Sequence, residues 1–319
     1  MARKLSLPVL FCLLVLGGNA IRDVPANDNK DIVGRWDLTV GTGGDAYPSW
    51  LEVTRKEGKL AGRFVGRVGS ARPIKQIDFG ANKLKFSLPP QYENMKTDLV
   101  FEGGLDASKR QLRGTTTGED GRTLGWLGVA APALPKPAHP KWGAPVTLFG
   151  GKDMTGWKLK NAKLPNGWKV ANGLLENKMP SSDIVTEQKF KDFKLHLEFN
   201  VAPKSNSGVY LRGRYEVQIQ DDFGKPPESH LIGGLYGFID PTENAARRAG
   251  EWQTYDITLL GRYVTVVLNG KTVINDKEIP GITGGALESR EGEPGPLMLQ
   301  GDHGDVSFRN VVLTPVAFE

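Results

Sequence analysis

The sequence contains one cysteine, Cys12, which lies within an apolar run near the amino terminus. We expect this segment to be removed, so that the mature chain carries no cysteine. Structural disulfides, thiolate metal sites and a thiol nucleophile are therefore excluded for the mature protein.

Long hydrophobic runs are also lacking. The apolar run LPVLFCLLVL (residues 7–16) is shorter than the ~20 residues that a membrane-spanning helix requires, and no later run comes close. Arg3 and Lys4 precede it and small residues follow up to Ala20, which is the pattern of an export signal over residues 1–20. We expect a periplasmic or extracellular protein without a membrane span, beginning near Ile21.

Charge of one sign is not concentrated anywhere in the chain. The formal net charge is +5, and without Arg3 and Lys4 it is about +3, with no basic block. A nucleic-acid partner is therefore not expected.

A proline-rich stretch divides the chain. Residues 129–145 (VAAPALPKPAHPKWGAP) have no periodic apolar pattern and predict a stiff linker. Before it, residues 31–128 alternate in short runs such as GRWDLTV at 34–40, separated by turn signals. This predicts a small antiparallel β meander or partial barrel, followed by a second domain over residues 146–319.

Strand signals dominate the second domain. The pairs Asn172-Gly173 and Asn269-Gly270 predict tight hairpins, and FKLHLEFNV (residues 193–201) alternates apolar and polar residues throughout. No convincing amphipathic helix exceeds two turns. The fold class is therefore all-β, an antiparallel β-sandwich of the jelly-roll kind preceded by the small β domain.

A polar ladder runs through LRGRYEVQIQ, residues 211–220. Because alternate side chains of a strand point to opposite faces, one set should face the core and the other should share a surface. That surface suits a hydroxyl-rich ligand, although a solvated outer strand face is the alternative. The polar set is Arg212, Arg214, Glu216, Gln218 and Gln220, and the apolar set is Leu211, Tyr215, Val217 and Ile219.

The polar residues of the strand at 193–201 extend this hypothesis. If this strand joins the same curved sheet, His196 and Glu198 lie beside the ladder in a polar groove. Glu198 and Glu216 could then act as acid and base or nucleophile in glycoside cleavage. A structural ion pair with a neighbouring arginine is the alternative for either glutamate.

His303 lies among glycines directly after the apolar strand PLMLQ, at an expected strand end. Its imidazole could act as a general base or bind a metal. Asp302 and Asp305 are near it, but their spacing matches no established ligand pattern. The sequence requires no cofactor, and a divalent metal is left open.

Four segments carry a family resemblance. They are LFGGKDMTGWK, SGVYLRGRYEVQIQD, GEWQTYDITLLG and GPLMLQGDHGDVSFRNVVL, in that order. Together they resemble the 3-keto-disaccharide hydrolase family over about residues 146–315. The resemblance implies a concanavalin A-like sandwich, bacterial export, and cleavage of sugars already oxidised at carbon 3.

The chemistry that the resemblance implies begins at carbon 2. A ketone at carbon 3 acidifies the carbon 2 hydrogen, a base removes it, the glycosidic oxygen leaves carbon 1, and water then adds. Such a reaction needs a base, cations or dipoles beside the enolate oxygen, and an acid for the leaving group.

Roles follow for residues on the family motifs. We hypothesise that Arg212 or Arg214 stabilises the enolate, that His303 or Glu216 is the base, and that Glu198 assists the leaving group or binds a hydroxyl. A 3-keto-glycoside is the expected partner. A non-catalytic carbohydrate-binding sandwich and an ordinary two-carboxylate glycosidase are the alternatives. The expected substrate-binding residues are Gln218, Tyr210, Gln300, His196 and Asp221.

Overall fold

The structure is a computed structural model that describes residues 31–91, 97–118 and 121–317. The predicted export signal, residues 1–20, lies outside the described residues. Apart from the short 3-10 turn η1 (Gly43–Asp45), the regular elements of the described part are β-strands in antiparallel sheets. This confirms the all-β prediction. Within those ranges no helix has the length and apolar character to cross a membrane.

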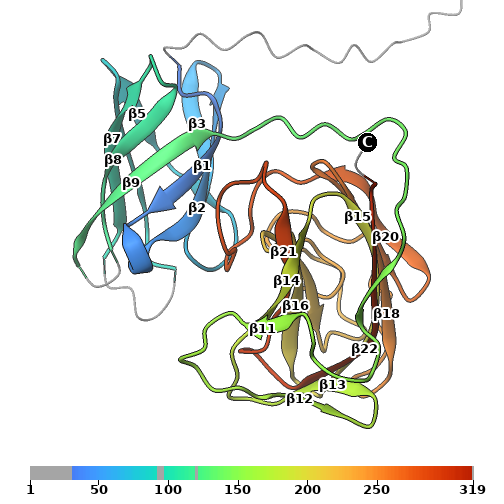
Figure 1. Cartoon of the computed structure of the whole chain (residues 1–319). Helices are drawn as coiled ribbons and strands as arrows, with labels where there is room; N and C mark the ends of the chain where they lie inside the picture. Colours follow the sequence, from blue (N-terminus) through green and yellow to red (C-terminus); the bar gives the residue numbers. More distant parts are fainter. Residues whose placement is uncertain (1–30, 92–96, 119–120, 318–319) are drawn as a thin grey trace, which may run out of the picture.

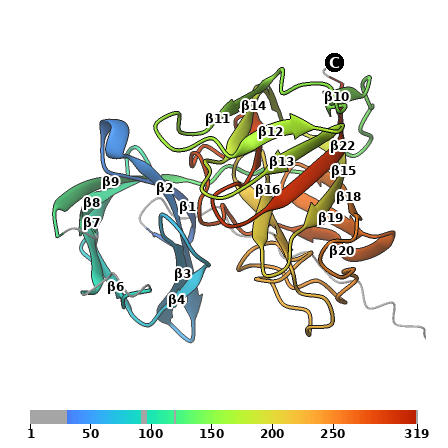
Figure 2. The same ribbon diagram turned by 90° about the horizontal axis from the view of Figure 1, so that it is seen from below.

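The first nine strands form one antiparallel sheet in the order β4-β3-β2-β1-β9-β8-β7-β6-β5. The sheet curls into an open barrel, seen end-on in Figure 2. Phe86 and Phe101 stack inside it with ring centroids 4.9 Å apart. The strands are β1 (Gly34–Val40), β2 (Tyr47–Lys56), β3 (Lys59–Val65), β4 (Arg72–Ile74), β5 (Ile77–Gly80), β6 (Lys83–Leu88), β7 (Leu99–Asp106), β8 (Gln111–Thr117) and β9 (Thr123–Ala130).

The remaining strands form a two-sheet sandwich beside the barrel (Figure 1). The larger sheet has the order β12-β13-β22-β15-β18-β19-β20, with β10 also paired to β22, and the smaller has the order β11-β14-β21-β16-β17. The strands are β10 (Val146–Phe149), β11 (Trp157–Leu159), β12 (Trp168–Ala171), β13 (Leu174–Asn177), β14 (Ile184–Phe190), β15 (Phe193–Val201), β16 (Asn206–Leu211), β17 (Tyr215–Gln220), β18 (Gln253–Leu260), β19 (Tyr263–Leu268), β20 (Lys271–Glu278), β21 (Gly295–Leu299) and β22 (Val306–Pro315).

Both predicted hairpins are present. Asn172 and Gly173 join β12 to β13 with φ of 52° and 78°, and Asn269 and Gly270 join β19 to β20 with φ of 51° and 80°. Asparagine and glycine tolerate these left-handed conformations, which give the turn a twist that matches the strands. The hairpins therefore arise from local turn chemistry.

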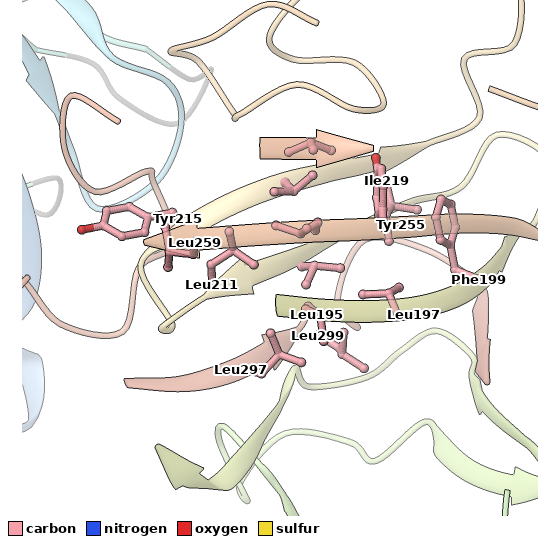
Figure 3. Packing of buried hydrophobic residues seen from close by; sticks show 14 of the residues in the cluster. Leu195, Leu197, Phe199, Leu211, Tyr215, Ile219, Tyr255, Leu259, Leu297 and Leu299 are labelled. Carbon is pink, nitrogen blue, oxygen red and sulfur yellow. The ribbon is translucent and has the colours of Figure 1, made fainter. Parts of the chain in front are cut away.

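The sandwich core lies between the two sheets (Figure 3). Leu195, Leu197 and Phe199 of β15 come from the larger sheet, and Tyr215 and Ile219 of β17 come from the smaller one. All five side chains are buried. Since side chains alternate along a strand, the polar residues between them point away from the core, outward from opposite sides of the sandwich.

The barrel packs directly on the sandwich. Trp50 and Val65 of the barrel belong to the same buried cluster as the sandwich core. The rings of Trp50 and Phe238 are perpendicular with their centroids 5.4 Å apart, and Arg35 pairs with Glu278 at 2.5 Å. The connecting segment is also held, because Arg262 donates to the carbonyl oxygen of Pro132 at 2.9 Å.

A buried carboxyl group lies near this contact. Asp37 of β1 is 3% exposed and lies near the buried ion pair of Arg262 and Glu291, whose atoms are 2.6 Å apart. Burial, reinforced by the charge of Glu291, raises the pKa of Asp37 to about 9. At neutral pH, Asp37 is therefore protonated in the folded protein.

Replacing Asp37 by asparagine should remove a pH-dependent loss of stability. The unfolded chain releases the Asp37 proton above its ordinary pKa of 3.8, whereas the folded protein holds it up to about pH 9. Wild-type stability should fall across that interval. The free energy of unfolding of Asp37→Asn minus that of wild type, both measured with urea, should increase steadily from pH 4 to pH 9. A constant difference would contradict the assignment.

Candidate active site

Strands β16 and β17 place a row of polar side chains on the outer face of the smaller sheet. Tyr210 pairs with Glu216 in the hairpin register, and Asn206 pairs with Gln220. The Tyr210 hydroxyl lies 2.8 Å from Glu216 Oε2. Gly208 leaves the space that the Glu216 carboxyl group occupies, since a Cβ at that position would overlap it. A buried tyrosine–carboxyl pair results.

A cavity of about 360 Å³ covers this row. Loops from six parts of the chain complete its wall: the segments between β3 and β4, after β11, before β14, between β17 and β18, between β20 and β21, and after β21. The lining residues include Lys160, Asp183, Asn206, Tyr210, Glu216, Gln218, Tyr236, Gln300, Asp302 and His303. A larger hollow of about 760 Å³ opens on the barrel. Two of its charged groups, Lys85 and Glu102, are paired with each other at 2.6 Å.

Glu216 is only 3% exposed, and this burial sets its protonation state. Burial raises the pKa of Glu216 to about 8, against the lowering effects of the Tyr210 hydroxyl and the charge of His303. Glu216 is therefore largely neutral at pH 7. The Tyr210 oxygen also lies 3.0 Å from the carbonyl oxygen of Gly284. Since the Tyr210 hydroxyl donates to Glu216 Oε2, the other oxygen of the neutral carboxyl group, Oε1, can hold the proton.

His303 and Asp302 form the second titratable pair of the cavity. The Nδ1 atom of His303 is hydrogen-bonded to Asp302, and the imidazole side chain is half exposed. This bond raises the pKa of His303 above its ordinary value, against the effect of burial, and the charges of Glu216 and Asp183 add to it. Asp302 fixes the ring so that Nε2 is available as a base.

Three amide side chains on the cavity wall each contain a buried oxygen that lacks a hydrogen-bond partner in the described structure. They are Asn206, Gln218 and Gln300. The Gln218 amide is oriented by its Nε2 atom, which donates to the carbonyl oxygen of His230 at 3.1 Å. Buried acceptors without a partner are costly, so these groups suit a ligand that brings hydroxyl donors.

Lys160 supplies an ammonium group to the cavity. Its Nζ atom lies 2.9 Å from Asp183 Oδ2, and the backbone N–H of Gly301 donates to Asp183 Oδ1 at 2.9 Å. Asp183 is 4% exposed, so Lys160 is held by a buried carboxylate. The cavity thus combines a cation, a histidine–aspartate pair, a neutral carboxyl group and free amide oxygens.

The chain matches a sequence model described as the 3-keto-α-glucoside-1,2-lyase-like domain, over residues 144–314. This match covers more than half of the 319 residues. The chain belongs to this family. The resemblance predicted from four sequence segments is confirmed, and residues 144–314 are called the lyase-like domain below.

Two solved structures from Parabacteroides distasonis, each provisionally named a glycosyl hydrolase, are similar to the chain. One is 30% identical with a TM-score of 0.47, covering 56% of this chain and 92% of the other. The second is 24% identical with a TM-score of 0.45, covering 54% of this chain and 94% of the other. A comparison with curated proteins found no match.

The lyase-like domain brings five of the predicted site residues to one cavity. They are Tyr210, Glu216, Gln218, Gln300 and His303. Asp221 does not line it; its Oδ2 atom accepts from the backbone N–H of Lys204 at 2.9 Å. Within the described ranges, no cluster of three histidine, cysteine, aspartate or glutamate side chains has an arrangement that could hold a metal ion.

The predicted position of the two arginines is wrong. The ladder is not one strand: β16 ends at Leu211 and β17 begins at Tyr215, so Arg212 and Arg214 occupy the turn between them. Arg212 has a φ of 53° and donates to the carbonyl oxygen of Gly261 at 2.6 Å. Both side chains are buried and neither lines the cavity, because the turn directs them into the protein interior.

The predicted groove beside β15 is also wrong. Strand β15 belongs to the larger sheet and β17 to the smaller one, so the polar faces that carry Glu198 and Glu216 point outward from opposite sides of the sandwich. Glu198 pairs with Arg309 at 2.6 Å, and His196 pairs with Asp256 at 2.7 Å. A two-carboxylate site built from Glu198 and Glu216 is therefore excluded.

Sequence reasoning missed several lining residues. Asn206 had a usable signal, because it shares the alternation of β16 with Tyr210, four residues later. Lys160 and Asp183 had none, since each lies just outside a short strand and they meet only through the pairing of β11 with β14. Long-range strand pairing is not visible in a single sequence.

Arg214→Ala should reduce stability rather than catalysis. Arg214 is fully buried and donates to Glu288 Oε1 at 2.6 Å and to the carbonyl oxygen of Glu293 at 2.9 Å. Removing one partner of such a pair costs about 3 kcal/mol. Arg309→Ala, which breaks the more exposed pair with Glu198, should cost less than about 1 kcal/mol. Urea unfolding measures both, and kcat per folded molecule should remain near wild type. A large loss of kcat in Arg214→Ala without loss of stability would return the arginine to the active site.

Proposed function

We propose that this protein hydrolyses 3-keto-glycosides by elimination and hydration. Membership of the lyase-like family and the names of the similar solved structures support a carbohydrate hydrolase-like role. The observation that carries the finer proposal is the pairing, in one cavity, of the His303–Asp302 base with the buried neutral carboxyl group of Glu216. Two groups whose pKa values are tuned by their surroundings suit proton removal and proton delivery.

In the first step, His303 Nε2 takes the proton from carbon 2 of the sugar. The electron pair of that bond moves into an enolate whose charge lies on the carbon 3 oxygen. Lys160 lines the cavity and is the cation that stabilises the negative charge on this oxygen. Stabilisation of a developing charge by a preorganised group is commonly the largest contribution to such catalysis.

In the second step, the enolate reforms the ketone and a double bond forms between carbons 1 and 2. The bond from carbon 1 to the glycosidic oxygen breaks, and that oxygen takes a proton from Glu216. Tyr210 holds the carboxyl group in place at 2.8 Å. Water then adds at carbon 1 and gives a proton to Glu216, and His303 returns its proton to carbon 2, so that the net reaction is hydrolysis and both groups are restored.

The three amide oxygens complete the proposal. A sugar has several hydroxyl donors, and Asn206, Gln218 and Gln300 each offer a buried acceptor on the cavity wall. An unoxidised sugar could form the same hydrogen bonds. It has no acidic carbon 2 hydrogen, so it should bind without reacting.

The decisive experiment incubates the purified protein with a 3-keto-disaccharide and, separately, with its unoxidised parent. Released monosaccharide is measured by chromatography. Release from the 3-keto sugar alone supports the proposal. Release from the parent at a comparable rate would indicate an ordinary glycosidase, and binding of both without release would indicate a carbohydrate-binding sandwich.

A further inference from the structure

The loop between β3 and β4 of the barrel forms part of the cavity wall. Val68 and Gly69 line the same cavity as Tyr210, Glu216 and His303. Both lie outside residues 144–314, so the lyase-like domain does not supply this wall. Val68 is 45% exposed and apolar, whereas most of the other lining side chains are polar.

Close backbone contacts with the sandwich hold this loop in place. The N–H group of Gly285 donates to the carbonyl oxygen of Arg67 at 3.0 Å. Gly284 approaches Gly69 so closely that a Cβ on Gly284 would overlap the Gly69 backbone. On another side, a Cβ on Gly237 would lie 2.5 Å from the Cβ of Ser70. Contacts from two segments of the sandwich make the loop a fixed wall.

The same contacts reach the proposed acid. Gly284, which packs on Gly69, presents its carbonyl oxygen 3.0 Å from the Tyr210 hydroxyl. That hydroxyl lies 2.8 Å from Glu216. The barrel loop therefore both borders the cavity and supports the segment that orients Tyr210.

We propose that the β3–β4 loop is part of the substrate site, that Val68 packs on an apolar face of a bound sugar ring, and that this wall restricts the site to short glycosides. The inference deepens the proposed function and rests on it. Sugar rings present C–H groups on their faces, and burial of such surface against an apolar side chain is favourable. A cavity of about 360 Å³ is near the lower end of small-molecule sites, roughly 300–1,000 Å³.

The test compares Val68→Asp and Val68→Ala with a control, Val129→Asp. Val129 lies on β9 of the same barrel, is 37% exposed and does not line the cavity. Steady-state kinetics use a 3-keto-disaccharide and a 3-keto-oligosaccharide of four sugars. Val68→Asp should raise KM for the disaccharide about tenfold, because a charge replaces the apolar contact. Val68→Ala should increase kcat/KM for the longer substrate relative to the disaccharide, and Val129→Asp should match wild type.

The outcomes separate the two proposals. An active wild type with the same KM and the same substrate preference in all three variants overturns the role of Val68 and leaves the proposed function standing. If the wild type releases no sugar, the proposed function fails. Contact between Val68 and the sugar is then tested by methyl NMR during titration with the 3-keto-disaccharide. Shifts of the Val68 methyl signals with constant Val129 signals support the wall. Constant Val68 signals overturn it.

Discussion

Glu216→Gln is expected to lower kcat on a 3-keto-disaccharide by about 10²–10⁴-fold, the usual range for loss of a general acid. Glutamine keeps the shape of the side chain but cannot deliver a proton to the departing oxygen. Glu216 is 3% exposed and accepts a hydrogen bond from Tyr210. The glutamine oxygen can accept the same bond, so the substitution should leave the fold intact.

The same variant should be more stable than wild type at neutral pH. The folded protein holds the Glu216 proton up to about pH 8, whereas the unfolded chain releases it above the ordinary pKa of 4.5. Stability of the wild type is therefore lost as pH rises through this interval, at up to roughly 1.4 kcal/mol per pH unit. Glutamine has no such loss. Thermal unfolding of both proteins from pH 4.5 to pH 8 measures the growing difference.

Glu198→Gln is the matched control for this prediction. Glu198 lies on the larger sheet, where it pairs with Arg309, and it does not line the cavity. It should therefore retain wild-type kcat. Full activity in Glu216→Gln, or a comparable loss in Glu198→Gln, would refute the role of Glu216 as the acid.

The second large effect is expected for His303→Gln, which should also lose about 10²–10⁴-fold in kcat because no base remains for the carbon 2 proton. In the wild type, kcat/KM should rise with pH through the pKa of His303, above 6.5, since the base must be unprotonated. It should fall again near pH 8, where Glu216 loses the proton that it must donate. A bell-shaped profile results.

Asp302→Asn tests the source of the acidic limb. The hydrogen bond to Asp302 is the largest cause that raises the pKa of His303, so its loss should move the acidic limb to lower pH. His196 offers a matched control, because it forms a similar pair with Asp256 at 2.7 Å on the outer face of the larger sheet. His196→Gln should leave the profile unchanged, and an acidic limb that stays in place in Asp302→Asn would contradict the assignment of the base.

Part of the site could be predicted because it depends on local chain geometry. Glu216 and Gln218 are two residues apart on β17, and alternation alone places them on one face opposite Tyr215 and Val217. His303 follows a buried strand in a glycine-rich loop, a usual location for a functional side chain. These predictions needed no knowledge of distant contacts.

The errors came from two sources. A positive φ at Arg212 and Gly213 turns the chain inside a segment whose alternation predicted one continuous strand. The sheet membership of β15 was the second source, because alternation defines the two faces of a strand but does not say which strands become neighbours. Glu198 and Glu216 therefore share the same local pattern although they lie on different sheets.

The order of residues along the chain was enough to predict the all-β fold, the two hairpins, the polar face of β17 and the family to which the chain belongs. The cavity required contacts between residues far apart in the chain. Lys160, Asp183 and His303 meet there through strand pairing, and Val68 arrives from a separate barrel. Folding brings these groups together because burial of apolar surface selects which strands pair and which faces pack, and that choice depends on the whole chain.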